Sequence, residues 1–323
     1  MAPLTIVDIG ASGGLHPRWT TVASSRRAVL VEPDPREYVN LQQTSGQVVI
    51  NSALSERPGE IDFHLCRAQP LSSVYRPNVQ LLSRFFSGEY LRGYDVVETR
   101  RLRADTLDNA LAAQGIRTVD AVKVDAQGHE LAILRGGTQA LGSAIALEVE
   151  VEFIELYSGQ PFFWDVNAFA AGQGFTLFDL RRDFFSLPET MQYGWRRGQL
   201  VCGDALYFRT PGDFLGMTPV PDEEHVVRAF LVYLAYGYAG TAASLVAEAT
   251  ERSLLSHSRR EGLLQMLRSR LSRRVIPEFR GKGTIYRALL SLARAFRPQV
   301  YAQGDQQLGN RYNNDEQGDY AAY

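Results

Sequence analysis

The chain has 323 residues, of which 45% are hydrophobic, so it is long enough for a full core and an additional region. Its formal net charge of −2 gives no general attraction to nucleic acid, and we expect no nucleic-acid partner. Only two cysteines occur, Cys66 and Cys202, which indicates neither a disulfide framework nor a cysteine-based zinc site. No basic segment precedes the first apolar run at about Leu4, so we expect no signal peptide and a cytoplasmic protein.

Short β-branched runs alternate with helix-length segments over residues 1–210, as in a parallel sheet with crossover helices. The last two runs could pair antiparallel around a long excursion. The sequence therefore predicts an α/β fold with a Rossmann-like sheet of seven strands, mostly parallel and with the last strand reversed. The predicted strands are residues 5–9, 28–32, 48–51, 119–125, 145–150, 176–180 and 200–208.

The first predicted strand runs into a glycine-rich turn, Asp8-Ile-Gly-Ala-Ser-Gly-Gly14, and Glu32 ends the next apolar run. Turn glycines let backbone N–H groups approach a ligand, and an acid after the second strand accepts hydrogen bonds from ribose hydroxyls. The Gly-x-Gly-x-x-Gly of a pyrophosphate site is missing, and Asp8 suits a ligand with an ammonium and a sulfonium. The pattern predicts S-adenosylmethionine, although Ser12 could also be an ordinary helix cap.

A second motif lies around the fourth predicted strand, in Lys123-Val-Asp-Ala-Gln-Gly-His-Glu130. Asp125 falls at the carboxyl end of a central strand, where open α/β sheets place residues that contact ligands. On the following strand Glu148 and Glu150 share one face, because alternate residues of a strand point the same way. The sequence therefore predicts that several carboxylates meet at one edge of the sheet.

These motifs, in this order, resemble the FkbM-type S-adenosylmethionine-dependent methyltransferases over about residues 4–210. The resemblance implies the class I methyltransferase fold and O-methylation, usually of a hydroxyl on a sugar, glycan or secondary metabolite. Two features depart from the family pattern, namely Leu15-His-Pro-Arg-Trp19 after the turn and the helical region after Pro211. The further matching pieces are Val31-Glu-Pro-Asp-Pro35, Asn51-Ser-Ala-Leu-Ser55, Thr106-Leu-Asp108, Leu134-Arg-Gly-Gly137 and Leu147-Glu-Val-Glu150.

The resemblance also implies roles for single residues. Glu32 would hold the ribose, Ser52 and Ala53 would lie beside the adenine, and Asp125 would lie near the sulfonium and the acceptor. Ser52 and Ala53 could equally be small residues at a strand end. The residues that would surround the methionine end of the cofactor are Asp8, Gly10, Ala11, Ser12 and Gly14.

Methyl transfer to a hydroxyl requires alignment and removal of the acceptor's proton. His129 is the first candidate base, His16 and His64 are the others, and each could also be structural. Lys123 shares a strand face with Asp125 and could orient it or simply pack its stem. An alternative with Mg²⁺ would use Asp125 with Glu148 or Glu150 as oxygen ligands, a pattern that ordinary cleft rims also show.

Two long segments are predicted to be loops that cover the site. The first spans residues 65–95, and the second spans residues 181–199. The second segment is rich in aromatic residues, which are Phe184, Phe185, Tyr193 and Trp195.

Residues 211–300 are predicted to form a helical region, followed by a disordered tail over residues 301–323. The uncharged stretch 229–246 is interpreted as two short helices that meet at residues 237–240 rather than as a membrane span. Residues 252–297 contain twelve Lys or Arg and two Glu. They could contact the inner face of a membrane or a phosphate-rich partner, or form a solvated face of a helical cap.

Three functions remain open at this stage. The first is O-methylation of a small molecule, a glycan or a lipid-linked sugar. The second is a nicotinamide-dependent dehydrogenase, which the missing Gly-x-Gly-x-x-Gly disfavours. The third is a non-catalytic module that docks on a membrane or polymer through the basic helices, which the intact Asp8, Glu32 and Asp125 disfavour.

Overall fold

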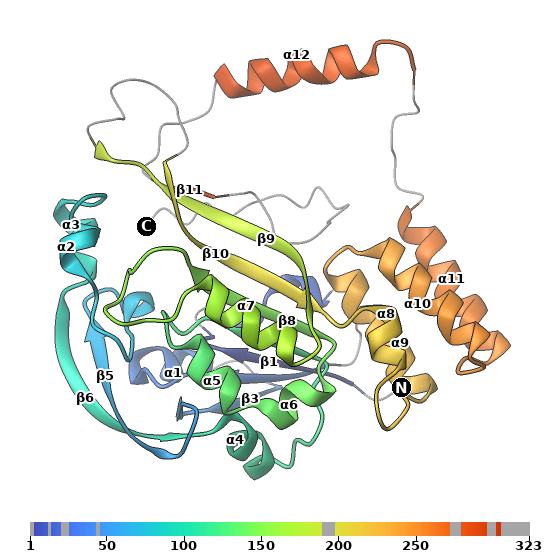
Figure 1. Cartoon of the computed structure of the whole chain (residues 1–323), viewed down its shortest axis with the longest axis horizontal. Coiled ribbons are helices and arrows are strands. Elements are labelled where there is room, and N and C mark those ends of the chain that lie inside the picture. The colour runs from blue at the N-terminus through green and yellow to red at the C-terminus, as the bar shows by residue number, and fades with distance from the viewer. Residues whose placement is uncertain are drawn as a thin grey trace.

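The computed structural model describes residues 3–11, 14–20, 26–42, 46–188, 198–271, 279–295 and 302–304 (Figure 1). Its centre is a sheet in the strand order β11-β9-β10-β8-β7-β1-β2-β3. The strands are β1 (Leu4–Ile9), β2 (Arg26–Val31), β3 (Gln47–Ile50), β7 (Ala121–Val124), β8 (Ala146–Glu152), β9 (Thr176–Phe185), β10 (Gln199–Phe208) and β11 (Ala302–Gly304).

The predicted sheet is confirmed. Strands β3, β2, β1, β7 and β8 run parallel, and β10 lies antiparallel between β8 and β9. Each of the seven predicted strands coincides with one of these within a few residues. The eighth strand, β11, pairs with β9 and comes from the stretch for which a disordered tail is predicted. The rest of that stretch lies outside the described residues.

Helices cover both faces of the sheet. Alternate strand residues point to opposite faces, so Val7, Val122 and Leu147 contact one helical layer, while Ile6 and Ala121 contact the other. The first layer consists of α4 (Leu107–Ala113), α5 (Glu130–Arg135), α6 (Thr138–Ser143) and α7 (Phe163–Gly172). The second layer includes η1 (Pro17–Thr20), α1 (Pro35–Leu41), α8 (Pro211–Leu215), α9 (Glu223–Ala235), α10 (Ala239–Glu251) and α11 (His257–Leu271).

The uncharged stretch 229–246 forms parts of α9 and α10, which confirms the two-helix interpretation. Asp222 begins α9 by accepting a hydrogen bond from the backbone N–H of His225 at 2.8 Å. Gly237, at φ +80°, lies in the turn between the two helices. No described helix has the length and apolar character that crossing a membrane would require.

Helix α9 is fixed to the sheet by buried polar contacts as well as by apolar packing. Arg228 donates from Nε to Asp120 Oδ1 at 2.9 Å, and Asp120 Oδ2 accepts from the backbone N–H of Thr5 at 2.8 Å. The Tyr233 hydroxyl donates to the carbonyl oxygen of Arg209 at 2.6 Å. Helices α8 to α11 therefore share one core with the sheet.

A second, three-stranded sheet has the order β4-β6-β5 and lies beside the central one (Figure 1). Much of β6 is charged and exposed, so it lacks the apolar run that would mark it as a strand. The segment 65–95, which precedes β6 and for which a loop is predicted, is loop only in part. It contains the end of β5, η2 (Gln69–Leu71), α2 (Val79–Leu82) and α3 (Gly88–Gly93), and the second sheet consists of β4 (Ala53–Leu54), β5 (Gly59–Cys66) and β6 (Val96–Asp105).

The second predicted loop, residues 181–199, is also partly strand. Phe184 and Phe185 belong to β9, which extends five residues beyond the predicted end of that strand. Tyr193 and Trp195 lie outside the described residues. Beyond α11, helix α12 (Lys282–Ala295) lies apart from the sheet and from the other helices (Figure 1).

Candidate active site

The glycine turn after β1 is packed directly against the end of β7. Gly10 has φ +74°, and its N–H donates to the carbonyl oxygen of Val31 at 3.0 Å. The N–H of Asp125 donates to the carbonyl oxygen of Ile9 at 3.0 Å. A Cβ atom added to Gly10 would lie 1.7 Å from the carbonyl oxygen of Asp125, so only glycine fits here. The turn and the carboxyl end of β7 therefore form one unit.

The remaining turn residues predicted to bind the cofactor are described in part. Ala11 is buried and accepts at its carbonyl oxygen from the N–H of Gly14 at 3.3 Å. Gly14 has φ +83°, with open space where a Cβ atom would be. Ser12 lies outside the described residues.

Lys123 lies between two carboxylates, one before the glycine turn and one at the end of its own strand. Its Nζ is 3.2 Å from Asp125 Oδ2 and 3.8 Å from Asp8 Oδ1. Burial raises the pKa of Asp8 to about 6. Burial also acts to raise the pKa of Asp125, but Lys123 and hydrogen bonds hold it below its ordinary value. Asp125 is therefore ionised at neutral pH, and Lys123 is placed to orient it.

Asp8 has an unsatisfied atom. Its side chain is buried, and Oδ1 has no hydrogen-bond partner among the described residues. A buried carboxylate oxygen without a donor is costly, and such groups in native structures usually have a reason. A ligand that brings a positively charged N–H group to this point would satisfy it.

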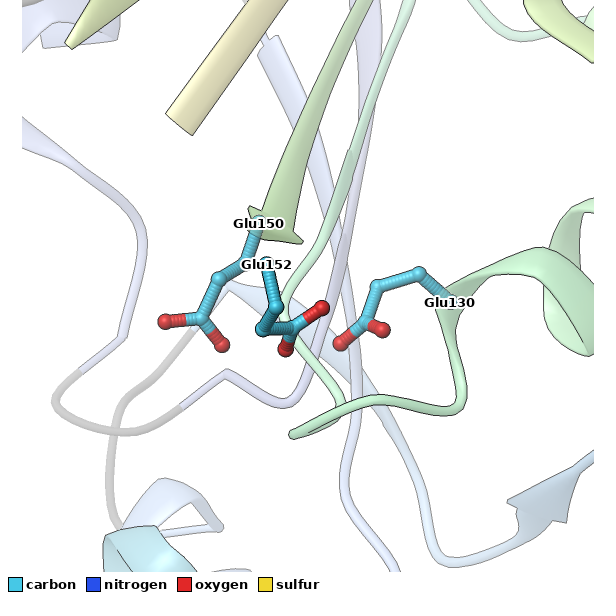
Figure 2. Close-up of side chains that lie close together, drawn as sticks. All are labelled: Glu130, Glu150 and Glu152. Carbon is cyan, nitrogen blue, oxygen red and sulfur yellow. The ribbon is translucent and has the colours of Figure 1, made fainter. Parts of the chain in front are cut away.

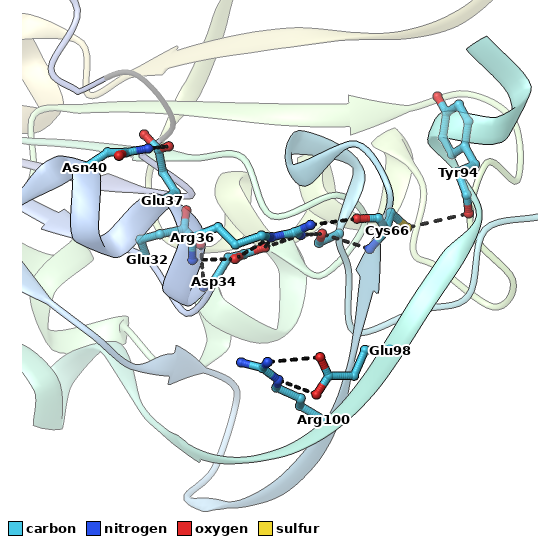
Figure 3. A network of polar contacts seen from close by, with 10 residues as sticks. Glu32, Asp34, Arg36, Glu37, Asn40, Cys66, Tyr94, Glu98 and Arg100 are labelled. Carbon is cyan, nitrogen blue, oxygen red and sulfur yellow. Dashed lines mark hydrogen bonds and ion pairs between the residues drawn. The ribbon is translucent and has the colours of Figure 1, made fainter. Parts of the chain in front are cut away.

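Glu32 directly follows β2, one residue beyond the observed end of that strand, and is also buried. Its Oε1 accepts from the backbone N–H of Asp34 at 2.7 Å, which fixes the side chain above the start of α1 (Figure 3). Burial raises its pKa to about 7. Asp34 caps α1, and Arg36 links this cap to the second sheet by donating to the carbonyl oxygen of Cys66 at 3.0 Å.

Ser52 and Ala53, predicted to lie near the adenine, come two and three residues after the end of β3. Ala53 begins β4 and pairs with Ala104 of the second sheet. The Ser52 hydroxyl donates to the carbonyl oxygen of Ala53 at 3.0 Å. Both residues therefore lie where the second sheet joins the carboxyl edge of the first.

Gln127 joins two of the acidic side chains, and no role for it follows from its sequence position alone. Its Nε2 donates to Asp125 Oδ1 at 3.1 Å and to Glu150 Oε2 at 2.7 Å. Its Oε1 accepts from the Tyr157 hydroxyl at 2.8 Å, and its carbonyl oxygen accepts from Ser73 at 2.7 Å. Its φ of +53° is rare for a residue other than glycine, and such strain concentrates at functional sites.

Three glutamates converge beside this bridge (Figure 2). One oxygen each from Glu130, Glu150 and Glu152 lie within 4.8 Å of one another. Burial raises the pKa of Glu130 to about 7 and raises the pKa values of Glu150 and Glu152 well above their ordinary value, with nearby carboxyls adding to the effect. Oxygen donors of this kind could bind a divalent cation or hold protons.

Of the three carboxylates predicted as alternative Mg²⁺ ligands, only Glu150 belongs to this group. Asp125 pairs with Lys123. Glu148 Oε2 lies 2.7 Å from Arg18 Nη1 and accepts from the Tyr236 hydroxyl at 2.8 Å. The structure thus places these three carboxylates in three different surroundings.

The contacts of Glu148 tie the C-terminal helices to the site. Tyr236 is the residue that ends α9, and the Arg18 guanidinium stacks on its ring at 4.6 Å from the centroid. Trp19 contacts the same ring edge-on, with centroids 5.6 Å apart. Arg18 and Trp19, in the segment after the glycine turn that departs from the family pattern, therefore contact Tyr236 at the end of α9. The sequence alone does not show that these two segments meet.

The three candidate histidines lie in different places. His129 precedes α5, its Nε2 is 3.3 Å from Ser55 Oγ, and burial lowers its pKa to about 4, so it is neutral at pH 7. His64 Nδ1 lies 2.9 Å from Thr99 Oγ1 in the second sheet. His16 Nδ1 accepts from the backbone N–H of Arg18 at 3.1 Å.

Comparison with known proteins identifies the family to which the chain is similar. The family model described as the methyltransferase FkbM domain matches residues 8–177. The 2-O-methyltransferase NoeI of Sinorhizobium fredii (strain NBRC 101917 / NGR234) is 29% identical over 168 residues, a match that covers 48% of this chain and 66% of that protein. This chain therefore spans slightly less than two thirds of that relative.

Among solved structures, magnesium protoporphyrin IX methyltransferase of Synechocystis PCC 6803, crystallised with bound SAM, matches 64% of this chain and 71% of its own. The identity is 11% and the TM-score is 0.33. Because the family model covers more than half of the sequence, this protein belongs to the FkbM methyltransferase domain family.

Proposed function

We propose that this protein transfers the methyl group of S-adenosylmethionine to a hydroxyl of a sugar, a glycan or a secondary metabolite. The observation that carries the proposal is the arrangement of acids around the glycine turn. Asp8, Glu32 and Asp125 lie at the carboxyl ends of three adjacent strands, and Gly10 packs against Asp125. Open α/β sheets bind ligands at this edge. The name of the S. fredii relative, a 2-O-methyltransferase, supports a hydroxyl acceptor.

The residues at this edge fit the cofactor's chemistry. The unsatisfied Oδ1 of Asp8 suits the cofactor's ammonium, which would also restore the ionised form that burial disfavours. Glu32, held through one oxygen by Asp34, suits the paired hydroxyls of a ribose. Ala11, Ser12 and Gly14 would border the methionine end, with Ser52 and Ala53 beside the adenine, as the sequence predicts.

S-adenosylmethionine supplies a methyl group on a positively charged sulfur, which is a good leaving group. The protein then has to align the acceptor and take its proton. Asp125 is the group we assign to the acceptor, because Lys123 keeps it ionised and it lies next to the glycine turn. His129 stays a candidate as a neutral imidazole, although a pKa of about 4 makes it a weak base at pH 7.

Isothermal titration of the full chain with S-adenosylmethionine tests the cofactor. Wild-type protein should bind it, and Glu32→Ala should weaken binding at least about tenfold, the order of one lost charge-assisted hydrogen bond. Glu98→Ala is the matched control, because this exposed glutamate forms an ion pair with Arg100 in the second sheet, away from the glycine turn (Figure 3). Absence of binding would overturn the proposal, and tight binding of NAD in its place would favour a dehydrogenase.

The chemical stability of the product distinguishes a hydroxyl acceptor, which gives a methyl ether, from a carboxylate acceptor, which gives a methyl ester. Labelled methyl groups transferred from the cofactor to oligosaccharides should survive mild alkali, because a methyl ether is stable there. Release of the label as methanol would indicate a methyl ester on a carboxylate and would contradict the proposed hydroxyl acceptor.

A further inference from the structure

Helix α12 presents an apolar face to solvent. Ile285, Leu289 and Leu292 follow one another at intervals of four and three residues and therefore share one side of the helix. Their side chains are 52%, 61% and 58% exposed, and the neighbouring Tyr286 is 64% exposed. On α11, by contrast, the leucines Leu263 and Leu267 are buried in the core. Among the residues that the structure describes, none covers the apolar side of α12 in this way.

The charge of this segment has one sign. Residues 279–295 contain four basic residues, Arg280, Lys282, Arg287 and Arg294, and no acidic residue. Arg287 is exposed and lies two positions after Ile285, which places it on the side of the helix away from the three aliphatic residues.

The arginines of α11 differ from those of α12. Arg259 lies 3.0 Å from Glu224, and Arg260 lies 3.0 Å from Glu261. Within α11 and its neighbours, part of the basic charge is therefore matched by acidic side chains, whereas the segment of α12 has no acid of its own.

We propose that α12 docks on an anionic lipid surface, with its apolar side among the acyl chains and its basic residues against the lipid phosphates. A helix that separates exposed apolar residues from basic ones has the design of an interfacial helix. Its 14 residues are fewer than the roughly 20 that a span requires, so it lies along the surface. The docking does not depend on the proposed methyl transfer.

Vesicle co-sedimentation of the full chain tests the docking. The protein should bind vesicles of phosphatidylcholine mixed with phosphatidylglycerol and should bind phosphatidylcholine vesicles at least about tenfold more weakly, since each basic residue contributes about fivefold at an anionic surface. Raised salt should weaken the binding, because exposed charges are screened. Arg287→Gln should lower the affinity about fivefold.

The double variant Leu289→Glu/Leu292→Glu should abolish sedimentation. Val39→Glu/Val79→Glu is its matched control, because it adds two carboxylates at exposed apolar positions, 56% and 49% exposed, on α1 and α2. Circular dichroism and thermal unfolding check that both variants fold. Three results would overturn the proposal, namely no binding to anionic vesicles, equal loss in both double variants, or concentration-dependent self-association that Leu289→Glu/Leu292→Glu removes.

Discussion

An aspartate flanks strand β7 at each end, and the two aspartates have different polar partners. At the amino end, Asp120 accepts hydrogen bonds from the Arg228 guanidinium at 2.9 Å and from the backbone N–H of Thr5 at 2.8 Å. At the carboxyl end, Asp125 shares Lys123 with Asp8 and lies beside three glutamates whose pKa values burial raises. Both aspartates flank the same four residues, so the difference comes from their partners.

This difference indicates that Asp120 stabilises the fold, whereas Asp125 serves the reaction. A buried ion pair with matched partners holds α9 on the sheet, and breaking one side of it would leave a charge without water. A group of carboxyls with too few cations costs stability, because each ionised member repels the others. Proteins place such groups where a ligand or a reaction uses them. The carboxyl end of β7 is therefore the reactive end.

The same substitution at both ends gives the largest expected contrast. Asp125→Asn should lower the rate of methyl transfer by about 10²–10⁴-fold, the range for removing a group that takes a proton. Its unfolding in urea should change little, because the amide keeps the bond to Gln127. Asp120→Asn is the matched variant and should lose stability with nearly unchanged turnover. Equal losses of turnover in both variants would contradict a catalytic role for Asp125 and a stabilising role for Asp120.

Removal of the cation at the amino end tests the other half of the comparison. Arg228→Met leaves Asp120 buried without its partner, so the free energy of unfolding should fall by about 3–5 kcal/mol in urea titrations. Adding Asp120→Asn should restore part of the loss, because the unpaired charge is gone. A fall below about 1 kcal/mol, the range of exposed pairs, would show that the pair does not anchor α9.

The pH dependence of one glutamate gives the smallest expected effect. Because the folded-state pKa of Glu130 is about 7, the folded state binds its proton more tightly than the unfolded chain does. This contribution to stability is present below about pH 4.5 and is lost as the pH rises through about 7. Glu130→Gln keeps the bonds from the N–H groups of Ala126 and Gly128, so its stability relative to wild type should rise over this window.

The rise should be on the order of 3 kcal/mol at most, measured by urea unfolding at pH 4.5 and pH 8 in the presence of a chelator. Glu60→Gln, at an exposed position on β5, is the control and should show no such pH-dependent difference. A parallel pH profile for Glu130→Gln and wild type would show that folding does not raise the pKa of Glu130.

The central sheet could be predicted because its strands are short apolar runs separated by helix-length segments, and burial on both faces leaves this pattern in the sequence. The second sheet could not, because β6 is a largely exposed ribbon rich in charged residues and lacks an apolar run. Gly10, Glu32 and Asp125 could be placed at one edge because they follow strands that run parallel.

The polar network of the site depends on contacts between distant segments. Gln127 accepts a hydrogen bond from the hydroxyl of Tyr157, thirty residues away. Glu148 accepts one from the hydroxyl of Tyr236, which lies in the helical region predicted to follow the methyltransferase domain. Spacing within a motif carries no information about such partners. The same holds for Glu152, whose burial beside Glu130 and Glu150 depends on how β8 meets the start of α5.

The sequence by itself determined the order of the elements, the acids and glycines of the carboxyl edge, and the family, because local pattern and strand direction are enough for these. Only the tertiary structure decided which acids are ionised and what holds them, because a pKa depends on burial and on neighbours from other strands and helices. It also showed that α9 packs against the sheet as part of its core, whereas the apolar side of α12 stays exposed.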